Sequence, residues 1–88
     1  MILKSDKFGN LLTNLAADDV PDLADGWAIE ISSLRITRFA RFYGEVDAGE
    51  VFAIVGSSGL LEIAMNRGSA HEKTGIVPGR KFRLDPLS

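Results

Sequence analysis

The hydrophobic pattern of the chain consists of short apolar runs separated by turn-forming residues, and its clearest example lies at residues 51–70. This stretch reads VFAIVGSSGLLEIAMNRGSA, in which the apolar runs 51–55 and 60–65 flank a Gly-Ser-Ser-Gly connection and precede a polar bend. Apolar runs this short, bounded by turn residues, are typical of buried strands, because helices usually need about ten residues or more. The stretch therefore predicts a β-hairpin with two polar loops.

Similar short runs recur along the rest of the chain. Residues 27–31 and 34–38 alternate apolar and polar positions with a period of two, as half-buried strands do. We expect further strands near the two ends of the chain and after an Asp-Lys-Phe-Gly-Asn turn, at residues 1–3, 11–15 and 80–84. Residues 69–72, Ser-Ala-His-Glu, have the form of a capping box and predict a short helix that ends at Gly75.

The pattern as a whole predicts an all-β fold in one domain, residues 1–88. About six or seven short strands at intervals of roughly ten residues favour an antiparallel barrel or sandwich, with at most about one or two short helical turns. No stretch is long enough for the crossover helix of a βαβ unit. A small antiparallel β-barrel is the architecture that we expect.

Two segments lack a regular pattern. Residues 16–26 carry several aspartates whose spacing does not match a calcium-binding loop, so we expect a solvated acidic loop. Residues 39–46 are rich in aromatic side chains, and their pattern allows either an irregular arm or a short helical turn. Phe39 and Phe42 suit a core face, whereas Tyr43, beside a glycine, could instead face solvent and a ligand.

Composition and charge narrow the classes of function. The chain has 88 residues, of which 45% are hydrophobic and 25% charged, as is ordinary for a globular domain. Its net charge of −2 argues against a nucleic-acid partner. The absence of cysteine and the single histidine argue against a metal centre or a Ser-His-Asp site. No membrane span or signal sequence is evident, so we expect a cytoplasmic protein without a membrane partner.

Two motifs resemble those of a known family. The stretches DKFGNLLTN, residues 6–14, and VGSSGLLEIAMNRGSA, residues 55–70, are similar to the carboxy-terminal domain of the S-adenosyl-L-methionine hydroxide adenosyltransferase family. That family is related to the fluorinases and chlorinases. Residues that look different in those halogenases favour the hydroxide-using branch, namely Ser58, Met65 and Arg67.

The resemblance implies how such a module works in a whole enzyme. A larger amino-terminal α/β domain, which we expect to be absent from residues 1–88, carries the catalytic groups. The enzymes form trimers, and S-adenosylmethionine binds between the α/β domain of one subunit and the barrel of its neighbour. Water or hydroxide attacks the ribose 5′ carbon, and adenosine and methionine result. Residues 1–88 would then form half of the substrate site, with no catalytic residue, metal or tightly bound cofactor, and would be inactive alone.

The resemblance also implies how this half-site holds the adenine. Phe8 would pack near the ring, Asn10 would hydrogen-bond its edge, and Tyr43 would stack on it. The backbone of the polar bend would read the amino group and ring nitrogens, at Met65, Asn66 and Arg67. These residue types suit a purine, which needs a stacking face together with donors and acceptors at its edge.

The methionine part of the ligand would contact other residues. Asp6 would receive the ammonium group, and Ser57 and the amides around Ser58 would receive the carboxylate. We expect the aromatic and amide groups of the adenine site to lie at one rim with the turn at Ser57 and with the bend 66–68. We also expect an exposed apolar patch where the α/β domain docks.

An alternative function stays open on the same residues. The chain could be a stand-alone module that binds a nucleoside or assembles oligomers without catalysis. A uniformly charged surface would favour that alternative.

Overall fold

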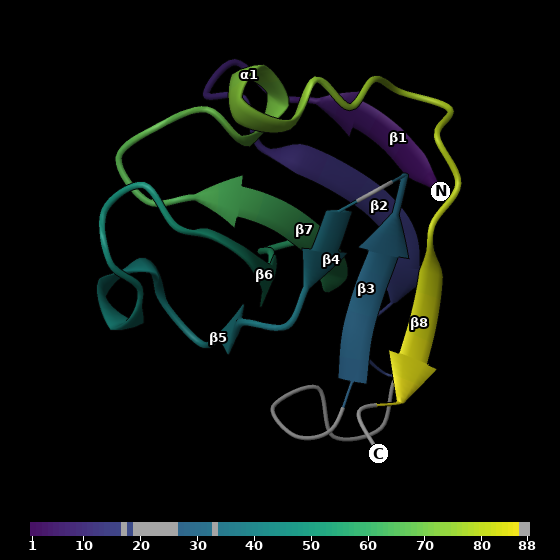
Figure 1. Ribbon diagram of the computed structural model, residues 1–88, viewed down its shortest axis with the longest axis horizontal. Helices are drawn as coiled ribbons and strands as arrows, with labels where there is room; N and C mark the ends of the chain where they lie inside the picture. The colour runs from purple at the N-terminus through teal and green to yellow at the C-terminus, as the bar shows by residue number, and fades with distance from the viewer. Residues whose placement is uncertain (17, 19–26, 33, 87–88) are drawn as a thin grey trace.

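The chain forms two β-sheets that pack around a shared core, in a computed structural model that describes residues 1–16, 18, 27–32 and 34–86 (Figure 1). The larger sheet has the strand order β1-β2-β7-β6-β5. Its strands are β1 (Ile2–Ser5), β2 (Leu11–Ala16), β7 (Leu60–Met65), β6 (Val51–Val55) and β5 (Phe39–Ala40). The smaller sheet has the order β4-β3-β8, with strands β4 (Leu34–Ile36), β3 (Trp27–Ile31) and β8 (Arg83–Pro86).

This architecture confirms the all-β prediction, but the described strands do not close into a barrel. Neighbouring strands are antiparallel except for β5 and β6, which pair in parallel. The difference arises after Ile36, where the chain leaves the smaller sheet and enters the larger one at Phe39. The strand predicted at 34–38 therefore ends early, as β4, and β5 forms at the start of the aromatic-rich segment, where no strand was expected; the described residues contain eight strands.

The helical segments are short. Helix α1 (Ala70–Thr74) begins where the capping box predicts, because the Ser69 hydroxyl accepts a hydrogen bond of 3.1 Å from the Glu72 amide. It ends at Gly75, whose φ of 70° is left-handed. A 3-10 helix, η2 (Tyr43–Glu45), forms in the aromatic-rich arm. No helix among the described residues is long and apolar enough to cross a membrane.

The predicted acidic loop can be assessed only in part. Of residues 16–26, the structure describes Ala16 and Asp18, and Asp18 is exposed. The remaining aspartates lie outside the described residues, at positions 19, 22 and 25.

The larger sheet is covered on both faces. One face packs on the smaller sheet through a core of fully buried side chains that includes Leu11, Ile29 and Ile63. The other face carries a second cluster, formed by Ala40, Val46, Phe52, Ile54 and Ala64. This double burial explains why β6 is apolar throughout, and β7 apolar except at Glu62, instead of alternating.

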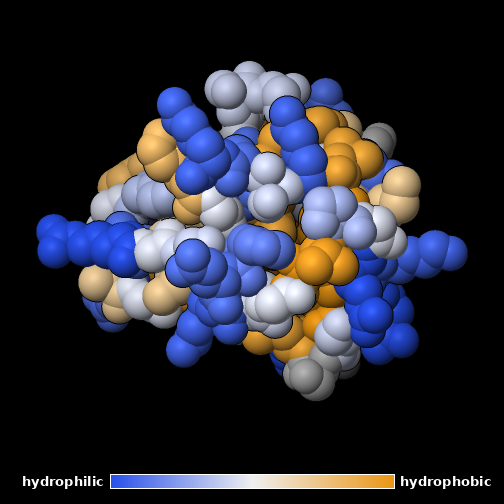
Figure 2. Space-filling view, turned by 90° about the horizontal axis from the view of Figure 1, so that it is seen from above, coloured by the Kyte–Doolittle hydropathy of each residue, from blue (hydrophilic) through white to orange (hydrophobic). Residues whose placement is uncertain are grey.

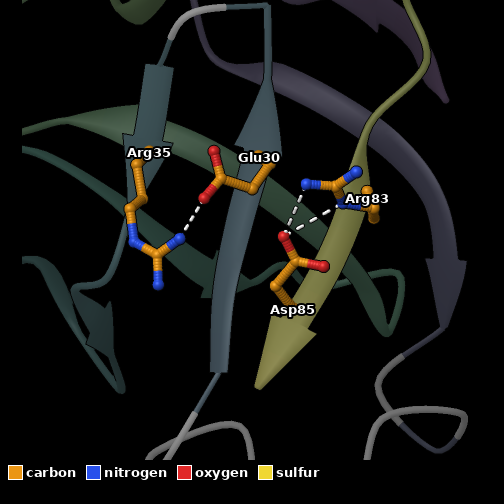
Figure 3. A network of polar contacts seen from close by, with 4 residues as sticks. All are labelled: Glu30, Arg35, Arg83 and Asp85. Carbon is orange, nitrogen blue, oxygen red and sulfur yellow. Dashed lines mark hydrogen bonds and ion pairs between the residues drawn. The ribbon is translucent and has the colours of Figure 1, made fainter. Parts of the chain in front are cut away.

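The outer face of the smaller sheet is charged (Figure 3). Glu30 on β3 pairs with Arg35 on β4, and on β8 the Arg83 guanidinium lies 2.8 Å from the Asp85 carboxylate. Exposed pairs of this kind contribute about 0–1 kcal/mol each. The ion pairs of this face therefore contribute little to stability.

One buried polar side chain holds β2 against β7. The Thr13 hydroxyl, fully buried, donates to the Leu61 carbonyl at 2.6 Å and accepts from the Leu15 amide at 3.2 Å. The pairing register of the two strands shifts between Leu12 and Ala16, so this hydroxyl takes the place of a regular backbone hydrogen bond.

We expect Thr13→Val to destabilise the fold. Valine has nearly the same shape but removes the hydroxyl that pairs with the Leu61 carbonyl and the Leu15 amide, which lowers the free energy of unfolding by about 1–3 kcal/mol. Urea denaturation measures the change. Thr37→Val, at an exposed position, is the matched control, and equal effects of the two variants would contradict this account of Thr13.

Candidate functional site

The loop between β1 and β2 is closed by the carboxylate of Asp6. Its Oδ1 accepts from the amides of Phe8 at 2.8 Å and Asn10 at 3.0 Å, and its Oδ2 accepts from the Asn10 side-chain Nδ2 at 3.2 Å. This is the backbone-capping geometry that Asp favours in turns. The loop presents Phe8 at its tip, where the ring is 68% exposed.

The same loop is fixed against the start of α1. The His71 amide donates to the Gly9 carbonyl at 2.8 Å. Gly9 has a φ of +84°, and a Cβ there would lie only 1.9 Å from the Ser69 hydroxyl oxygen. Only glycine satisfies both the backbone conformation and the close approach, so the position of Phe8 depends on this contact.

Asn10 connects the loop to the aromatic arm. Its Nδ2 donates to the Tyr43 hydroxyl at 3.0 Å, although the two residues are 33 positions apart. The Tyr43 ring also packs edge-to-face on Phe52, with centroids 5.2 Å apart. Burial raises the pKa of Tyr43 against the opposing effect of the Asn10 hydrogen bond, and the nearby Glu62 and Asp6 charges raise it further. The hydroxyl is therefore neutral at physiological pH.

The bend after β7 is tied to the same arm. The Asn66 side-chain Nδ2 donates to the Val46 carbonyl at 2.6 Å, and the Asn66 backbone carbonyl accepts from the Gly49 amide at 2.8 Å. Arg67 adopts a left-handed φ of 58°, which turns the chain sharply. The bend is thus held in place by its own polar groups.

The loop between β1 and β2, the aromatic arm and the bend after β7 border one open hollow of about 360 Å³. Its walls are two exposed aromatic rings, an amide, a thioether and a guanidinium, from Phe8, Asn10, Tyr43, Met65, Arg67 and Gly68. Hollows of this size hold small-molecule ligands. A planar, hydrogen-bonding ring such as a purine suits these groups, because it can stack on the aromatics and bond the amide.

The structure separates the predicted site residues into two groups. Phe8, Asn10 and Tyr43 lie together with the bend, as we expected, and two further predicted residues, Met65 and Arg67, line the same hollow. Asp6 and Asn66 do not line it and instead hold its walls in place.

The turn at Ser57 is not part of this rim, contrary to our expectation. Ser57 and Ser58 are exposed in the connection between β6 and β7, whereas the bend lies at the opposite end of β7. A strand of this length separates the two loops by roughly 15–20 Å.

Glu62 is a candidate that the sequence reading missed. It lies in the middle of β7, where it pairs with Leu12 and Ile54 on the neighbouring strands. Burial raises the pKa of Glu62, and the Asp6 carboxylate raises it further. The sequence does show Glu62 as the single acidic residue within the apolar run 60–65, and this is the feature that could have identified it.

A second hollow, of about 260 Å³, has a different character. It lies along β5 and β6 and is lined almost entirely by apolar groups, from Phe39, Ala40, Arg41, Ala53, Ile54, Val55 and Leu61. It lacks the converging polar groups that orient a small polar ligand. We therefore place the candidate ligand site at the hollow beside Phe8.

Apolar side chains also reach the surface elsewhere. The large exposed ones are Met1, Leu3, Phe8, Phe42, Tyr43, Val55 and Val77. Figure 2 shows apolar side chains gathered in a band on one half of the face seen from above, with hydrophilic side chains around them. The surface is therefore not uniformly charged. A uniformly charged surface would have favoured the stand-alone module.

The fold and the hollow define a small two-sheet β module with an open, aromatic-lined ligand face. Residues 1–83 match the model of the SAM hydroxide adenosyltransferase C-terminal domain, and the chain belongs to this family.

The similar proteins are longer than this chain. An (R)-S-adenosyl-L-methionine hydrolase from Thermus thermophilus is 41% identical over 83 residues, which are 94% of this chain and 30% of that protein. A crystal structure of a conserved hypothetical protein from Thermus thermophilus has a TM-score of 0.77 at 41% identity, covering 96% of this chain and 33% of the other. A crystal structure of an uncharacterized conserved protein from Thermotoga maritima has a TM-score of 0.77 at 29% identity, covering 96% of this chain and 35% of the other. The chain spans about a third of the length of these relatives.

We predict that Glu62→Gln stabilises the fold at neutral pH. Because the pKa of Glu62 is raised in the folded state, its ionised form costs stability above that pKa. This loss of stability disappears as the pH falls to the pKa of glutamate in the unfolded chain, about 4.3. The gain from the variant should therefore shrink between pH 7 and pH 4.

Thermal or urea unfolding at several pH values measures this effect. The matched control is Glu30→Gln, which removes the ion pair with Arg35 and should slightly lower stability at pH 7. A loss of stability in Glu62→Gln at pH 7 would contradict the prediction.

Proposed function

We propose that this chain provides the adenosine-recognising half of a site for S-adenosylmethionine, in an enzyme that converts S-adenosylmethionine and water to adenosine and methionine. The observation that carries the proposal is the hydrogen bond from Asn10 to Tyr43, which places both residues beside Phe8 at one hollow. Membership of the SAM hydroxide adenosyltransferase family and the hydrolase relative support the choice of ligand.

Asn10 is oriented to recognise adenine. Its Nδ2 donates to the Asp6 carboxylate and to the Tyr43 hydroxyl, so its Oδ1 is the atom left to face a ligand. A carbonyl oxygen only accepts hydrogen bonds and therefore suits the exocyclic amino group of adenine. Phe8 and Tyr43 supply the stacking faces, and the backbone at Met65, Asn66 and Arg67 supplies further donors and acceptors.

The chemical step belongs to groups outside this half-site. In the proposed reaction, water forms a bond to the ribose 5′ carbon, the bond from that carbon to sulfur breaks, and the electron pair stays on the sulfur of methionine. The water gives up a proton. Residues 1–88 position the substrate for an α/β domain of the same or a neighbouring subunit, with a homotrimer as the complete assembly, and are inactive alone.

The methionine end of the ligand lies away from the adenine hollow. Ser57 and Ser58 are exposed in the turn between β6 and β7, where hydroxyl and amide groups can receive the carboxylate. The ligand is then extended along the outer face of β7, and its only firm support within this chain is the adenine end. We therefore expect weak binding by the chain alone.

We expect Phe8→Ala to weaken adenosine binding to the chain. Loss of one aromatic stacking partner costs about 1–3 kcal/mol, or roughly 5- to 150-fold in Kd. NMR titration with adenosine measures the change. Phe42→Ala is the matched control, because Phe42 is 61% exposed but does not line the hollow. Equal losses in both variants, or none in either, would contradict the assignment.

Enzymatic function can be tested in a chimera. Residues 1–83 of this chain replace the matching segment of the Thermus thermophilus hydrolase, and adenosine release from S-adenosylmethionine is followed by chromatography. We expect activity within about tenfold of the parent, and a further loss of at least tenfold when Tyr43→Ala is added. A folded chimera that releases no adenosine would favour a binding or assembly module.

A further inference from the structure

Tyr43 lies on a short arm that is buried only at its two ends. Ala40, at the end of β5, and Val46, after η2, both belong to the second cluster of buried side chains. The residues between them are exposed or half-buried, and Tyr43 is 39% exposed. The ring itself has two contacts, the Asn10 hydrogen bond and the edge-to-face packing on Phe52. Exposed segments with few buried contacts open readily, so the position of the ring also depends on what holds the backbone of the arm.

Glu45 closes this arm with both its side chain and its backbone. Its Oε1 atom accepts a hydrogen bond from the Arg41 amide at 2.9 Å, which joins the two ends of the exposed stretch. Its backbone carbonyl accepts from the Arg38 guanidinium at 2.6 Å. Because both arginines precede Tyr43 and Glu45 follows it, these two hydrogen bonds close the chain into a loop that carries Tyr43.

The hydrogen bond to the Arg41 amide matters more than the ion pair between the same two residues. The Arg41 Nε atom lies 3.8 Å from the Glu45 Oε1 atom, and the Arg41 side chain is 91% exposed. Exposed ion pairs contribute little, whereas a backbone amide that donates to a carboxylate forms a charge-assisted hydrogen bond. The arm therefore needs a hydrogen-bond acceptor at position 45 more than it needs a charge there.

The same arm is joined to the bend that borders the hollow. The Val46 amide donates to the Tyr43 carbonyl at 3.1 Å, and the Val46 carbonyl accepts from the Asn66 side chain at 2.6 Å. Glu45 lies between Tyr43 and Val46 in the chain, but it does not line the hollow. Loss of its contacts would therefore displace a stacking ring without removing any group that faces the ligand.

We propose that Glu45 is a positioning residue for the adenosine site, which holds the ring of Tyr43 at the hollow by closing the arm on Arg41 and Arg38. This assignment rests on the proposed function, because it takes adenosine as the ligand. Glu45 acts through Tyr43 and does not itself contact the ligand.

Binding of adenosine to Glu45→Ala and Glu45→Gln tests the assignment. Alanine removes the acceptor, and an arm that holds Tyr43 in place in about one tenth of the molecules raises the Kd about tenfold. Glutamine keeps an oxygen that can accept from the Arg41 amide, so we expect its Kd to stay within about twofold of the unaltered chain. Arg41→Ala removes only the exposed partner of the ion pair. It is the matched control and should also stay within about twofold.

The contact between the rings of Tyr43 and Phe52 gives a second readout that needs no ligand. Tyr43 is the only tyrosine of the chain, and nuclear Overhauser effects from its ring to Phe52 report its position. We expect these effects to be lost in Glu45→Ala and kept in Glu45→Gln. If Glu45→Ala does not fold, Arg38→Met, which removes the other hydrogen bond of Glu45, carries the test, and both readouts should change in the same direction.

The outcomes separate this assignment from the proposed function. A folded Glu45→Ala that binds adenosine as the unaltered chain does, or that keeps the ring contact, overturns the assignment and leaves the proposed function standing. Equal weakening in Glu45→Ala and Glu45→Gln also overturns it, because the charge and not the acceptor would then be responsible. If the unaltered chain does not bind adenosine at millimolar concentration, the proposed function falls, and the role of Glu45 in adenosine binding falls with it.

Discussion

The candidate site depends on one hydrogen-bonded link, from the Asp6 carboxylate through the Asn10 side chain to the Tyr43 hydroxyl. It joins a loop near the start of the chain to an arm more than thirty residues later. The loop contributes Phe8 and the arm contributes Tyr43 to the hollow, and neither ring alone forms a binding surface. Because Asn10 donates to both partners, one side chain places Phe8 and Tyr43 at the same hollow and leaves its own oxygen free for a ligand.

The larger sheet provides the rigid support for this link. Its inner face is buried against the smaller sheet, and its outer face carries the cluster around Phe52 on which Tyr43 rests. Loops that hold functional groups need a scaffold of this kind, because a binding geometry is lost when its supports move. The charged outer face of the smaller sheet has no such arrangement, and its ion pairs contribute little to stability.

Local patterns predicted much of this structure, and long-range contacts account for what they missed. The capping box at Ser69, the turn at Gly9 and the hairpin of β6 and β7 are local features, and each was predicted. The parallel pairing of β5 with β6 was not, because it depends on where the chain crosses between sheets after Ile36. The separation of the Ser57 turn from the adenine hollow, and the pairing of Glu62 with Leu12 and Ile54, likewise require strand register that periodicity does not define.

The central claim is that an adenosine ring occupies the hollow beside Phe8 and Tyr43. Intermolecular nuclear Overhauser effects in a complex of the chain with adenosine test it most directly. The account predicts contacts from the adenine protons to the rings of Phe8 and Tyr43. Contacts to the apolar hollow between Phe39 and Leu61 instead, with none to Phe8 or Tyr43, would contradict it.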